Sequence, residues 1–358
     1  MYGFIADVHL FTKLPNEDYL KSLKMFLDII REQDEVCYGI FVCGDLFDHR
    51  GNNDELKFAC RYILNLVYNH CGKDNKNAPV YFVHGTFSHD HEQYEIFFPL
   101  LSKLPDIEVH YVKHVTAATT HAGHKILYLP QEYGNIDYSD FFKKKYDIIV
   151  GHGPIGAENK TPCKSHGYEI MHSVETLGKI STLCVFGHYH DYTDFGNGVY
   201  YVGANLRWKY GEDEPCVFFI CDNDLNVKTF PNPVAKEFKS IYINSPEELR
   251  AEIAKEDDSY RRFIITANDP ETLSTYHAIM GNMKNNDKLT FRITSDFKEE
   301  DNEDHLPDID PDELSQTTSG LDPVQSLIAY IQEKHNMDTT EQVREYEQKI
   351  RKDIESDS

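Results

Sequence analysis

The sequence lacks several features that define particular classes of protein. No apolar stretch approaches the ~18 residues that a bilayer-spanning helix requires, so we expect no membrane partner. The opening residues MYGFIADVHLF carry no basic leader and include Asp7 and His9, which argues against a signal peptide. The eight cysteines form no Cys-x-x-Cys pair, and Cys43 and Cys184 lie inside apolar runs, as reduced buried thiols do. These absences predict a soluble, cytoplasmic protein.

Positive charge is also scarce. The chain has 36 Lys and Arg residues against 60 Asp and Glu residues, which gives a formal net charge of -24. Half of this excess lies in residues 298–358, where 6 basic residues stand against 18 acidic ones. Such a balance excludes a protein that holds nucleic acid by charge alone. It does not exclude a DNA substrate, because bound cations can neutralise some carboxylates of the remaining chain.

The apolar pattern predicts a layered α/β architecture. Hydrophobic residues make up 40% of the chain and aromatic residues 13%, which indicates a globular core. Over the first two-thirds, short apolar runs alternate with helical periodicity, the latter over residues 19–30 and 56–67. We expect strands at YGFIADVH, YGIFVCGD, PVYFVHG, KILYLP, YDIIVGHG and TLCVFGHYH. The runs GVYYVGAN and CVFFICDN are expected to complete a second sheet.

Changes in composition divide the chain into four segments. Residues 1–235 form the predicted core domain, and residues 236–297 predict a smaller β-α-β-α-β unit. Residues 298–320 carry too much charge to fold alone and are interpreted as an acidic linker. Residues 321–355 predict two short helices, with Asp322 as the cap of the first. This helical pair is either a hairpin on the body or a docking element for a partner.

Asp and His residues follow the ends of five predicted strands. Two residues that are two apart in a strand point the same way, as His188 and His190 do in GHYH and Asp7 and His9 do in ADVH. Each pair alone fits solvated side chains as well as ligands. In a layered α/β fold, however, strand ends converge on one rim. Mixed Asp and His ligands suit Mn²⁺, Fe²⁺ or Zn²⁺, and six of them with one bridging carboxylate serve two ions ~3.5–4 Å apart.

The series D-x-H, G-D, a glycine-led His-Asp, G-H and G-H-x-H resembles the calcineurin-like metallophosphoesterases over residues 1 to about 210. The resemblance implies a four-layer α/β/β/α sandwich, here followed by a smaller α+β capping domain and a C-terminal helical hairpin. It also implies a non-ligand histidine, His89, that acts on the phosphate or its leaving group. The implied ligands are Asp7, His9 and His190 for one ion, Asp45 as the bridge, and His152 and His188 for the second ion.

One motif departs from the family pattern. The family reads G-N-H-D or G-N-H-E, where the Asn amide oxygen completes the second metal. Here GTFSHD has two extra residues, and Ser88 stands before His89. Ser88 is our candidate for the missing ligand, directly or through water, with Thr86 or solvent as alternatives. The nearby imidazoles are expected to be solvated or core histidines; these are His49, His84 and His91.

Further features narrow the resemblance. They are GDLFD with its second Asp, YYVGANLRWKYGE after the last motif, KSHG at 164–167, and the order of cap, linker and tail. This layout is similar to the SbcD-type and meiotic-recombination-eleven-type nuclease subunits, above all the compact bacteriophage-encoded version. It implies an Mn²⁺-dependent DNA nuclease in the cytoplasm, that of the host cell for a phage protein. The implied activities are 3′-to-5′ cleavage of duplex ends and endonucleolytic cleavage of single strands and hairpins.

The resemblance implies two protein partners as well. Residues 321–355 would dock on the coiled coil of an SbcC-type ATPase. A homodimer would form through the helix at 54–69 or through the run at 94–104. The alternative for the run at 94–104 is that it belongs to the hydrophobic core. Two other functions stay open: a phosphomonoesterase or cyclic-nucleotide phosphodiesterase with the same metals, and a non-catalytic scaffold with a weakened second metal. The long segment after the last motif weighs against the first, and the intact His89 weighs against the second.

Overall fold

The structure of the protein is a computed structural model that describes residues 1–71, 76–132, 136–156, 170–212, 214–281, 283, 286 and 288–295. All of these residues belong to one compact unit, Met1–Asp296. The expected acidic linker at 298–320, the helical segment at 321–355 and the KSHG motif at 164–167 lie outside the described residues. No helix within the described ranges is both long and apolar enough to cross a membrane.

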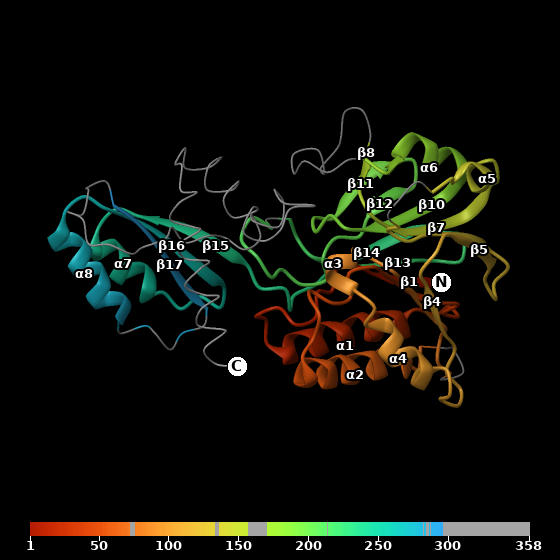
Figure 1. The fold of residues 1–358 in the computed structure, drawn as a ribbon, viewed down its shortest axis with the longest axis horizontal. Coiled ribbons are helices and arrows are strands. Elements are labelled where there is room, and N and C mark those ends of the chain that lie inside the picture. The colour runs from red at the N-terminus through yellow and green to blue at the C-terminus, as the bar shows by residue number, and fades with distance from the viewer. Residues whose placement is uncertain are drawn as a thin grey trace, which may run out of the picture. The chain divides into compact units, whose positions relative to one another are not determined.

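Two six-stranded sheets form the body of the protein (Figure 1). The first contains, in spatial order, β14 (Val227–Pro231), β13 (Val217–Cys221), β1 (Tyr2–Ile5), β2 (Ile40–Cys43), β3 (Val80–Val83) and β4 (Val109–Val112). The second contains β11 (Thr193–Gly196), β12 (Val199–Tyr201), β10 (Ser181–Gly187), β7 (Tyr146–His152), β6 (Lys125–Leu129) and β5 (Thr116–Thr119). The central strands of both sheets run parallel, and antiparallel strands lie toward their edges.

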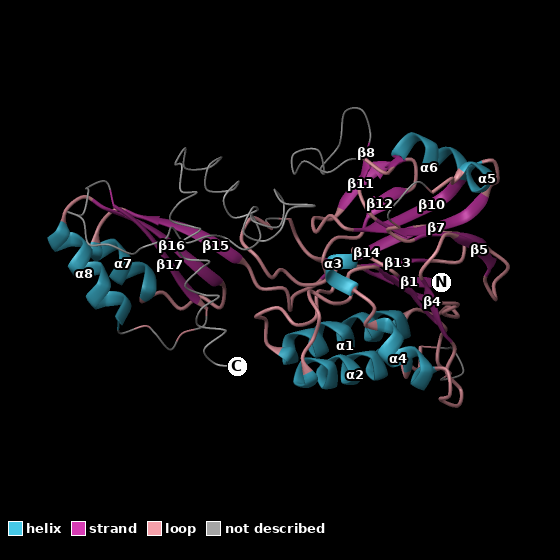
Figure 2. Cartoon of the chain, in the orientation of Figure 1, coloured by secondary structure: helices cyan, strands magenta, loops and turns pink. Residues whose placement is uncertain are grey.

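Helices cover the outer face of each sheet, which makes four layers (Figure 2). The first sheet is covered by α1 (Asn16–Glu32), α2 (Asn53–Val67) and α4 (Tyr94–Leu101), and the second by α5 (Ser139–Phe142) and α6 (Val174–Ile180). One apolar core fills the space between the sheets, and one lies under each helical layer. A short parallel pair, β8 (Ile155–Gly156) and β9 (His172–Ser173), stands apart from both sheets. The expected α/β/β/α sandwich is confirmed.

Alternating side chains build the two faces of each sheet. In β1, Phe4 points into the core between the sheets, whereas Ile5 packs under the helices. In β2, Phe41 and Ile40 divide in the same way. This period of two follows from the pleat of a strand. Full burial of a side chain of this size contributes about 1.5–3 kcal/mol relative to exposure, so the alternation fixes which residues of each strand pack between the sheets and which pack under the helices.

One strand lies in a different sheet from the one expected. The run GVYYVGAN forms β12 in the second sheet, as expected. The run CVFFICDN was expected in the same sheet, but it forms β13 in the first sheet, where Cys221 lies opposite Tyr2 of β1. In β13, Phe218 packs under the helices and Phe219 between the sheets. A strand that is apolar on both faces fits an inner position in either sheet, so its pattern does not specify its partner.

A smaller parallel sheet follows the body, in the order β-α-β-α-β expected for this segment. Its elements are β15 (Phe238–Ile243), α7 (Pro246–Ile253), β16 (Tyr260–Ala267), α8 (Pro270–Gly281) and β17 (Leu289–Ser295), with β16 in the middle of the sheet. Ser245 caps α7 by accepting a hydrogen bond from the Glu248 N–H. The domain boundary between residues 235 and 236 stays a prediction.

Candidate metal centre

Six of the predicted ligands lie at the carboxyl ends of parallel strands or in the loops that follow them. Asp7 and His9 follow β1, and Asp45 follows β2. In the second sheet, β7 and β10 pair so that His152 lies opposite Gly187, the residue before His188. His190 follows in the same loop. Strand ends of this kind share one edge of an α/β sheet, which brings together residues that are far apart in the sequence.

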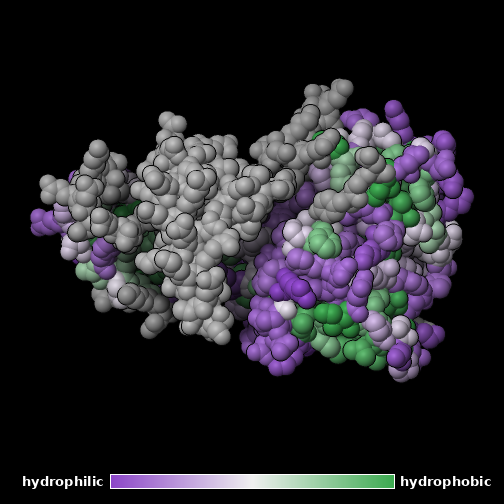
Figure 3. All heavy atoms as spheres, viewed as in Figure 1, coloured by the Kyte–Doolittle hydropathy of each residue, from purple (hydrophilic) through white to green (hydrophobic). Residues whose placement is uncertain are grey.

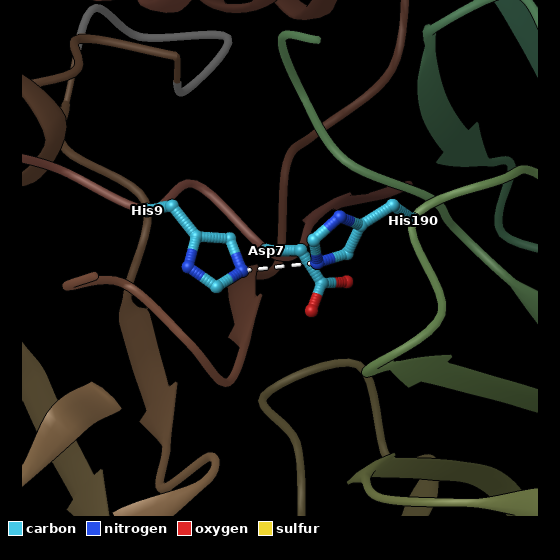
Figure 4. Close-up of side chains that lie close together, drawn as sticks. All are labelled: Asp7, His9 and His190. Carbon is cyan, nitrogen blue, oxygen red and sulfur yellow. Dashed lines mark hydrogen bonds between the residues drawn. The ribbon is translucent and has the colours of Figure 1, made fainter. Parts of the chain in front are cut away.

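Asp7, His9 and His190 form the first ligand group, with ligand atoms within 4.8 Å of one another (Figure 4). His9 Nε2 and His190 Nε2 lie 3.1 Å apart. The Asp7 carboxylate accepts the His188 N–H at 2.8 and 3.0 Å, which fixes its orientation. Two imidazole nitrogens and a carboxylate that converge in this way form a ligand set for Mn²⁺, Fe²⁺ or Zn²⁺.

Neighbouring side chains hold the histidines of the first group in place. His190 Nδ1 lies 2.6 Å from Glu212 Oε1, so Nδ1 carries the proton and Nε2 keeps its lone pair for a metal. Glu212 is buried, and its Oε2 also accepts a hydrogen bond from the backbone N–H of Trp208 at 3.0 Å. The Trp208 indole packs against the His9 ring, with 4.9 Å between ring centroids. Tyr19 donates its hydroxyl hydrogen to the His9 carbonyl at 2.7 Å.

Asp45, His152 and His188 form the second ligand group. His152 Nε2 lies 3.2 Å from Asp45 Oδ2, and His152 Nδ1 lies 2.8 Å from the Cys43 carbonyl. Because only a protonated Nδ1 can donate to that carbonyl, Nε2 is the ring nitrogen that can lose its proton and offer a lone pair to a metal. The His188 ring stands perpendicular to the His152 ring, with centroids 5.4 Å apart.

Asp45 lies between the two groups. Its Oδ2 atom is 3.2 Å from His152 Nε2 in the second group and 4.0 Å from His9 Nε2 in the first. This is the position that a carboxylate bridging two ions requires.

The centre buries more carboxylate charge than its own side chains compensate. Burial raises the pKa of Asp7 to about 8, with His152 opposing and Asp45 adding to the rise. Burial and the charge of Asp45 raise the pKa of Asp90 to about 7. Burial would also raise the pKa of Asp45, but His152 holds it well below its ordinary value. Divalent cations stabilise ionised carboxylates in such a place, so the charge of the site fits bound metal.

The imidazoles mostly have the protonation state that metals require. Burial lowers the pKa of His9 to about 4 and that of His188 to about 3, so both rings are neutral at pH 7. His152 is the exception. Burial lowers its pKa, but Asp45 outweighs this effect and raises the pKa to about 9. A cation at the second group would therefore take the place of a proton.

The loops of the centre hold conformations that few residues adopt. Asp7, His9 and Asp45 each have φ of 47°, in the left-handed region, which costs about 1–3 kcal/mol for a residue other than glycine. Gly44 has φ of 79°, and a Cβ there would overlap the His152 ring. A Cβ at Gly85 would likewise overlap Asp45. Strained residues of this kind cluster at functional sites, and the glycines allow the loops to approach one another.

His89 lies beside the first group, in the short helix α3 (Phe87–Asp90). Its Nδ1 is 2.6 Å from the Asp48 carbonyl, and its ring stands perpendicular to the His9 ring with 4.8 Å between centroids. His89 and His9 also form a third group of ligand-type atoms with the Asp48 carboxylate. The His89 side chain is half-buried, so it is accessible to a substrate at the centre.

The structure does not bring Ser88 to the second group. Ser88 is exposed on α3, and no described hydrogen bond joins its hydroxyl to Asp45 or His152. Thr86 lies there instead, with Oγ1 3.2 Å from Asp45 Oδ2 and 3.3 Å from His152 Nε2. The two extra residues of GTFSHD enter the turn of α3, which carries Ser88 outward, while Thr86 at the N-cap stays next to Gly85.

The other histidines near the centre have structural surroundings. His84 is buried, with Nδ1 2.9 Å from the Tyr111 hydroxyl, and burial lowers its pKa to about 4. His49 is exposed and lies 3.3 Å from Glu55. His91 is partly exposed at the end of α3. These are the core and solvated positions expected from the sequence.

Sequence reasoning assigned no role to four residues that lie at the centre or beside it: Asp48, Glu212, Trp208 and Gln131, whose Oε1 lies 3.0 Å from Thr86 Oγ1. Asp48 and Glu212 stand in the segments GDLFD and YYVGANLRWKYGE, which carried the resemblance, but no role was assigned to either. Trp208 stands in the second of these segments too. Gln131 follows the strand KILYLP without any recognisable motif. Only the paired Asp residues of GDLFD offered a signal that could have been used.

Comparison with known proteins agrees with this geometry. No curated protein matches the chain. The family model for calcineurin-like phosphoesterases matches residues 2–192, which is more than half of the chain. The matched range holds every member of both ligand groups and His89, and the family consists of metal-dependent phosphoesterases that bind divalent cations. The chain belongs to the calcineurin-like phosphoesterase family.

Proposed function

We propose that this protein is a two-metal DNA nuclease subunit that acts in DNA end processing, recombination and repair. It would cleave duplex ends as a 3′-to-5′ exonuclease and single strands and hairpins as an endonuclease, with Mn²⁺ as the metal. Residues 321–355 would dock on an SbcC-type coiled-coil ATPase. The observation that carries the hydrolytic part is the position of Asp45 between two ligand groups, with His89 beside them.

Two divalent ions would supply a nucleophile at neutral pH and neutralise charge on the phosphate. His89 would have the other chemical role in the reaction. Its Nδ1–H donates to the Asp48 carbonyl, which holds the ring in one orientation. If the ring also carries a proton on Nε2, His89 would donate a hydrogen bond from Nε2 to the scissile phosphate, or transfer this proton to the leaving 3′-oxygen.

A segment that joins the centre to the small sheet favours a large substrate. Trp208 packs on the first ligand group, and two residues later Tyr210 contacts Phe238 at 5.3 Å between ring centroids. The Tyr210 hydroxyl lies 3.0 Å from Thr290 Oγ1, and the Arg262 guanidinium lies 4.3 Å from the centre of its ring. A small phosphate ester does not need a second folded unit attached to the wall of its site.

The charge of the chain supports a division of labour with a partner. A net charge of -24 is unfavourable for holding a polyanion. The ions would bind the scissile phosphate, and the ATPase would supply most of the affinity for DNA. The isolated chain should therefore bind long duplex weakly at physiological salt, and tight binding by the chain alone would contradict this division.

A panel of substrates tests the proposed function. The full chain with Mn²⁺ would be incubated with end-labelled duplex, single-stranded and hairpin DNA, and in parallel with a chromogenic phosphomonoester. We expect cleavage of DNA by the wild-type protein and none by Asp45→Asn, which removes the bridging charge. Asp140→Asn, the same change at an exposed carboxylate, is the matched control and should cleave as the wild type does.

The same acidity favours one alternative, a phosphomonoesterase or cyclic-nucleotide phosphodiesterase, because a small substrate needs no basic surface. Hydrolysis of the chromogenic ester without DNA cleavage would select this alternative. A protein that binds two Mn²⁺ ions and hydrolyses no substrate would instead be a scaffold.

A homodimer through α4 is part of the proposal. Tyr94, Phe97 and Leu101 are buried in the body, but Ile96 and Leu100 are 52% and 65% exposed. Figure 3 shows apolar surface gathered over the helices in the lower part of the view. Leu100→Glu should convert a dimer into a monomer in light scattering, whereas a wild-type protein that is monomeric at micromolar concentration would contradict this interface.

A further inference from the structure

We infer that Gln131 supplies an amide oxygen to the ion held by Asp45, His152 and His188, and that Thr86 orients this oxygen. In this protein the pair would replace the Asn that the family pattern places after the glycine. The inference rests on the two-ion centre of the proposed function but not on its DNA substrate.

The Thr86 hydroxyl lies close to three atoms that carry lone pairs. Oγ1 lies 3.0 Å from Gln131 Oε1, 3.2 Å from Asp45 Oδ2 and 3.3 Å from His152 Nε2. The hydroxyl has one proton and can donate it to only one of these three atoms. An amide oxygen, a carboxylate oxygen and a ring nitrogen thus gather around one small group. Such convergence of lone pairs is the arrangement that a cation satisfies.

The pairing of β6 with β7 places Gln131 near His152. β6 and β7 are parallel, and Leu129 lies opposite Gly151. Gln131, two residues beyond Leu129, therefore comes next to Gly153 and His152; a Cβ at Gly153 would lie 3.8 Å from Gln131 Cγ. The Gln131 N–H also donates to the His84 carbonyl at 3.2 Å, which ties it to the loop of Gly85 and Thr86.

The burial of Gln131 and the chemical type of its side-chain oxygen also support the inference. Gln131 is buried and follows β6 of the second sheet, and its Oε1 meets Thr86, which follows β3 of the first sheet and contacts Asp45 and His152. A neutral amide oxygen is the same donor type as the Asn oxygen of the family pattern. The exposed Ser88 hydroxyl offers neither this donor nor this position.

Titration of the full chain with Mn²⁺ tests the inference without substrate. Electron paramagnetic resonance of free Mn²⁺ counts the ions bound, and the fluorescence of Trp208 reports on the first group. Trp208 is the sole tryptophan of the chain, and its ring packs against His9 and His190 at 4.9 and 5.6 Å between centroids, so the paramagnetic ion should quench it. The variants are Gln131→Leu, which removes the oxygen, Gln131→Glu, which keeps one, and Ser88→Ala as the control.

We expect the wild-type protein and Ser88→Ala to bind two ions. Gln131→Leu should weaken one of them by about 10- to 100-fold, the range known for residues that support a metal site, with unchanged quenching of Trp208. Gln131→Glu should restore the second ion. Tight binding of two ions by Gln131→Leu would overturn the inference and leave the two-ion centre intact. Equal weakening of both ions would also overturn it, and fewer than two ions in the wild type would refute the two-ion centre itself.

Discussion

The two histidines of the first ligand group are held by side chains, whereas His152 of the second is held by a backbone carbonyl and lies beside a loop with an altered motif. In the first, Glu212 and Trp208 fix His190 and His9. In the second, a carbonyl fixes His152, and the residue that would complete the group is not the one expected from the motif. The difference suggests that a metal site tolerates a change of ligand where the supporting contacts come from the backbone, since these do not depend on a neighbouring side chain.

The largest effect should come from the residue that both groups share. Asp45→Asn should remove both ions and reduce phosphoester cleavage by about 10³-fold or more, because the charge stabilisation by metal is worth several kcal/mol. Ion counting and initial rates would be measured on the same preparation. Retention of both ions by this variant would show that the two groups are independent.

A comparable loss of rate with no loss of metal should follow from His89→Ala. General acid catalysis contributes about 10²–10⁴-fold, so the rate should fall by that factor while two Mn²⁺ ions remain bound. His121→Ala serves as the control because this imidazole is exposed and pairs only with Glu108 among its described contacts. If His89→Ala cleaves at the wild-type rate, His89 does not have the proposed role.

A selective effect on the first group should follow from Glu212→Gln. The substitution keeps the shape of the side chain but removes the charge that accepts the His190 Nδ1–H, and we expect the affinity of one ion to fall by about 10-fold or more. Trp208 quenching would shift to higher Mn²⁺ concentration, whereas in Gln131→Leu it would not. Equal shifts in the two variants would remove the distinction between the groups.

Stability should respond to both groups together. Because the ions bind the folded chain, Mn²⁺ at 100 times its dissociation constant should add about 2.7 kcal/mol for each site to the free energy of unfolding. Thermal melts with Mn²⁺ and with a chelator measure this change. An unchanged melting temperature would mean that the buried carboxylates do not hold cations.

The smallest effect is expected at Ser88. Ser88→Ala should leave ion binding and cleavage rate unchanged, since its hydroxyl is exposed and has no described contact with the second group. A lost ion in this variant would return Ser88 to the ligand role that the sequence favoured.

Most of the fold and of the two ligand groups could be predicted, because both follow from periods along the chain. Short apolar runs predicted the strands, and the chemistry at their ends predicted Asp7, Asp45 and the histidines that the structure brings together. The sheet of β13 could not be predicted, because Phe218 and Phe219 make both of its faces apolar. Which sheet such a strand joins depends on pairings distant in sequence.

The remaining parts of the site depend on contacts that leave no local pattern. Gln131 comes within 3.0 Å of Thr86, beside the second group, through the register of β6 against β7, which no single segment encodes. Glu212 lies 22 residues after His190 and contacts it only once the chain has folded. The sequence could not show whether Ser88 or Thr86 lies at the second group, because the two extra residues of GTFSHD could have placed either hydroxyl there.

Crystals of the protein soaked in Mn²⁺ would test the central claim most directly. The anomalous difference map should show two peaks ~3.5–4 Å apart, one at each ligand group, with Asp45 between them. A single peak, or peaks away from Asp45, would contradict the two-metal centre.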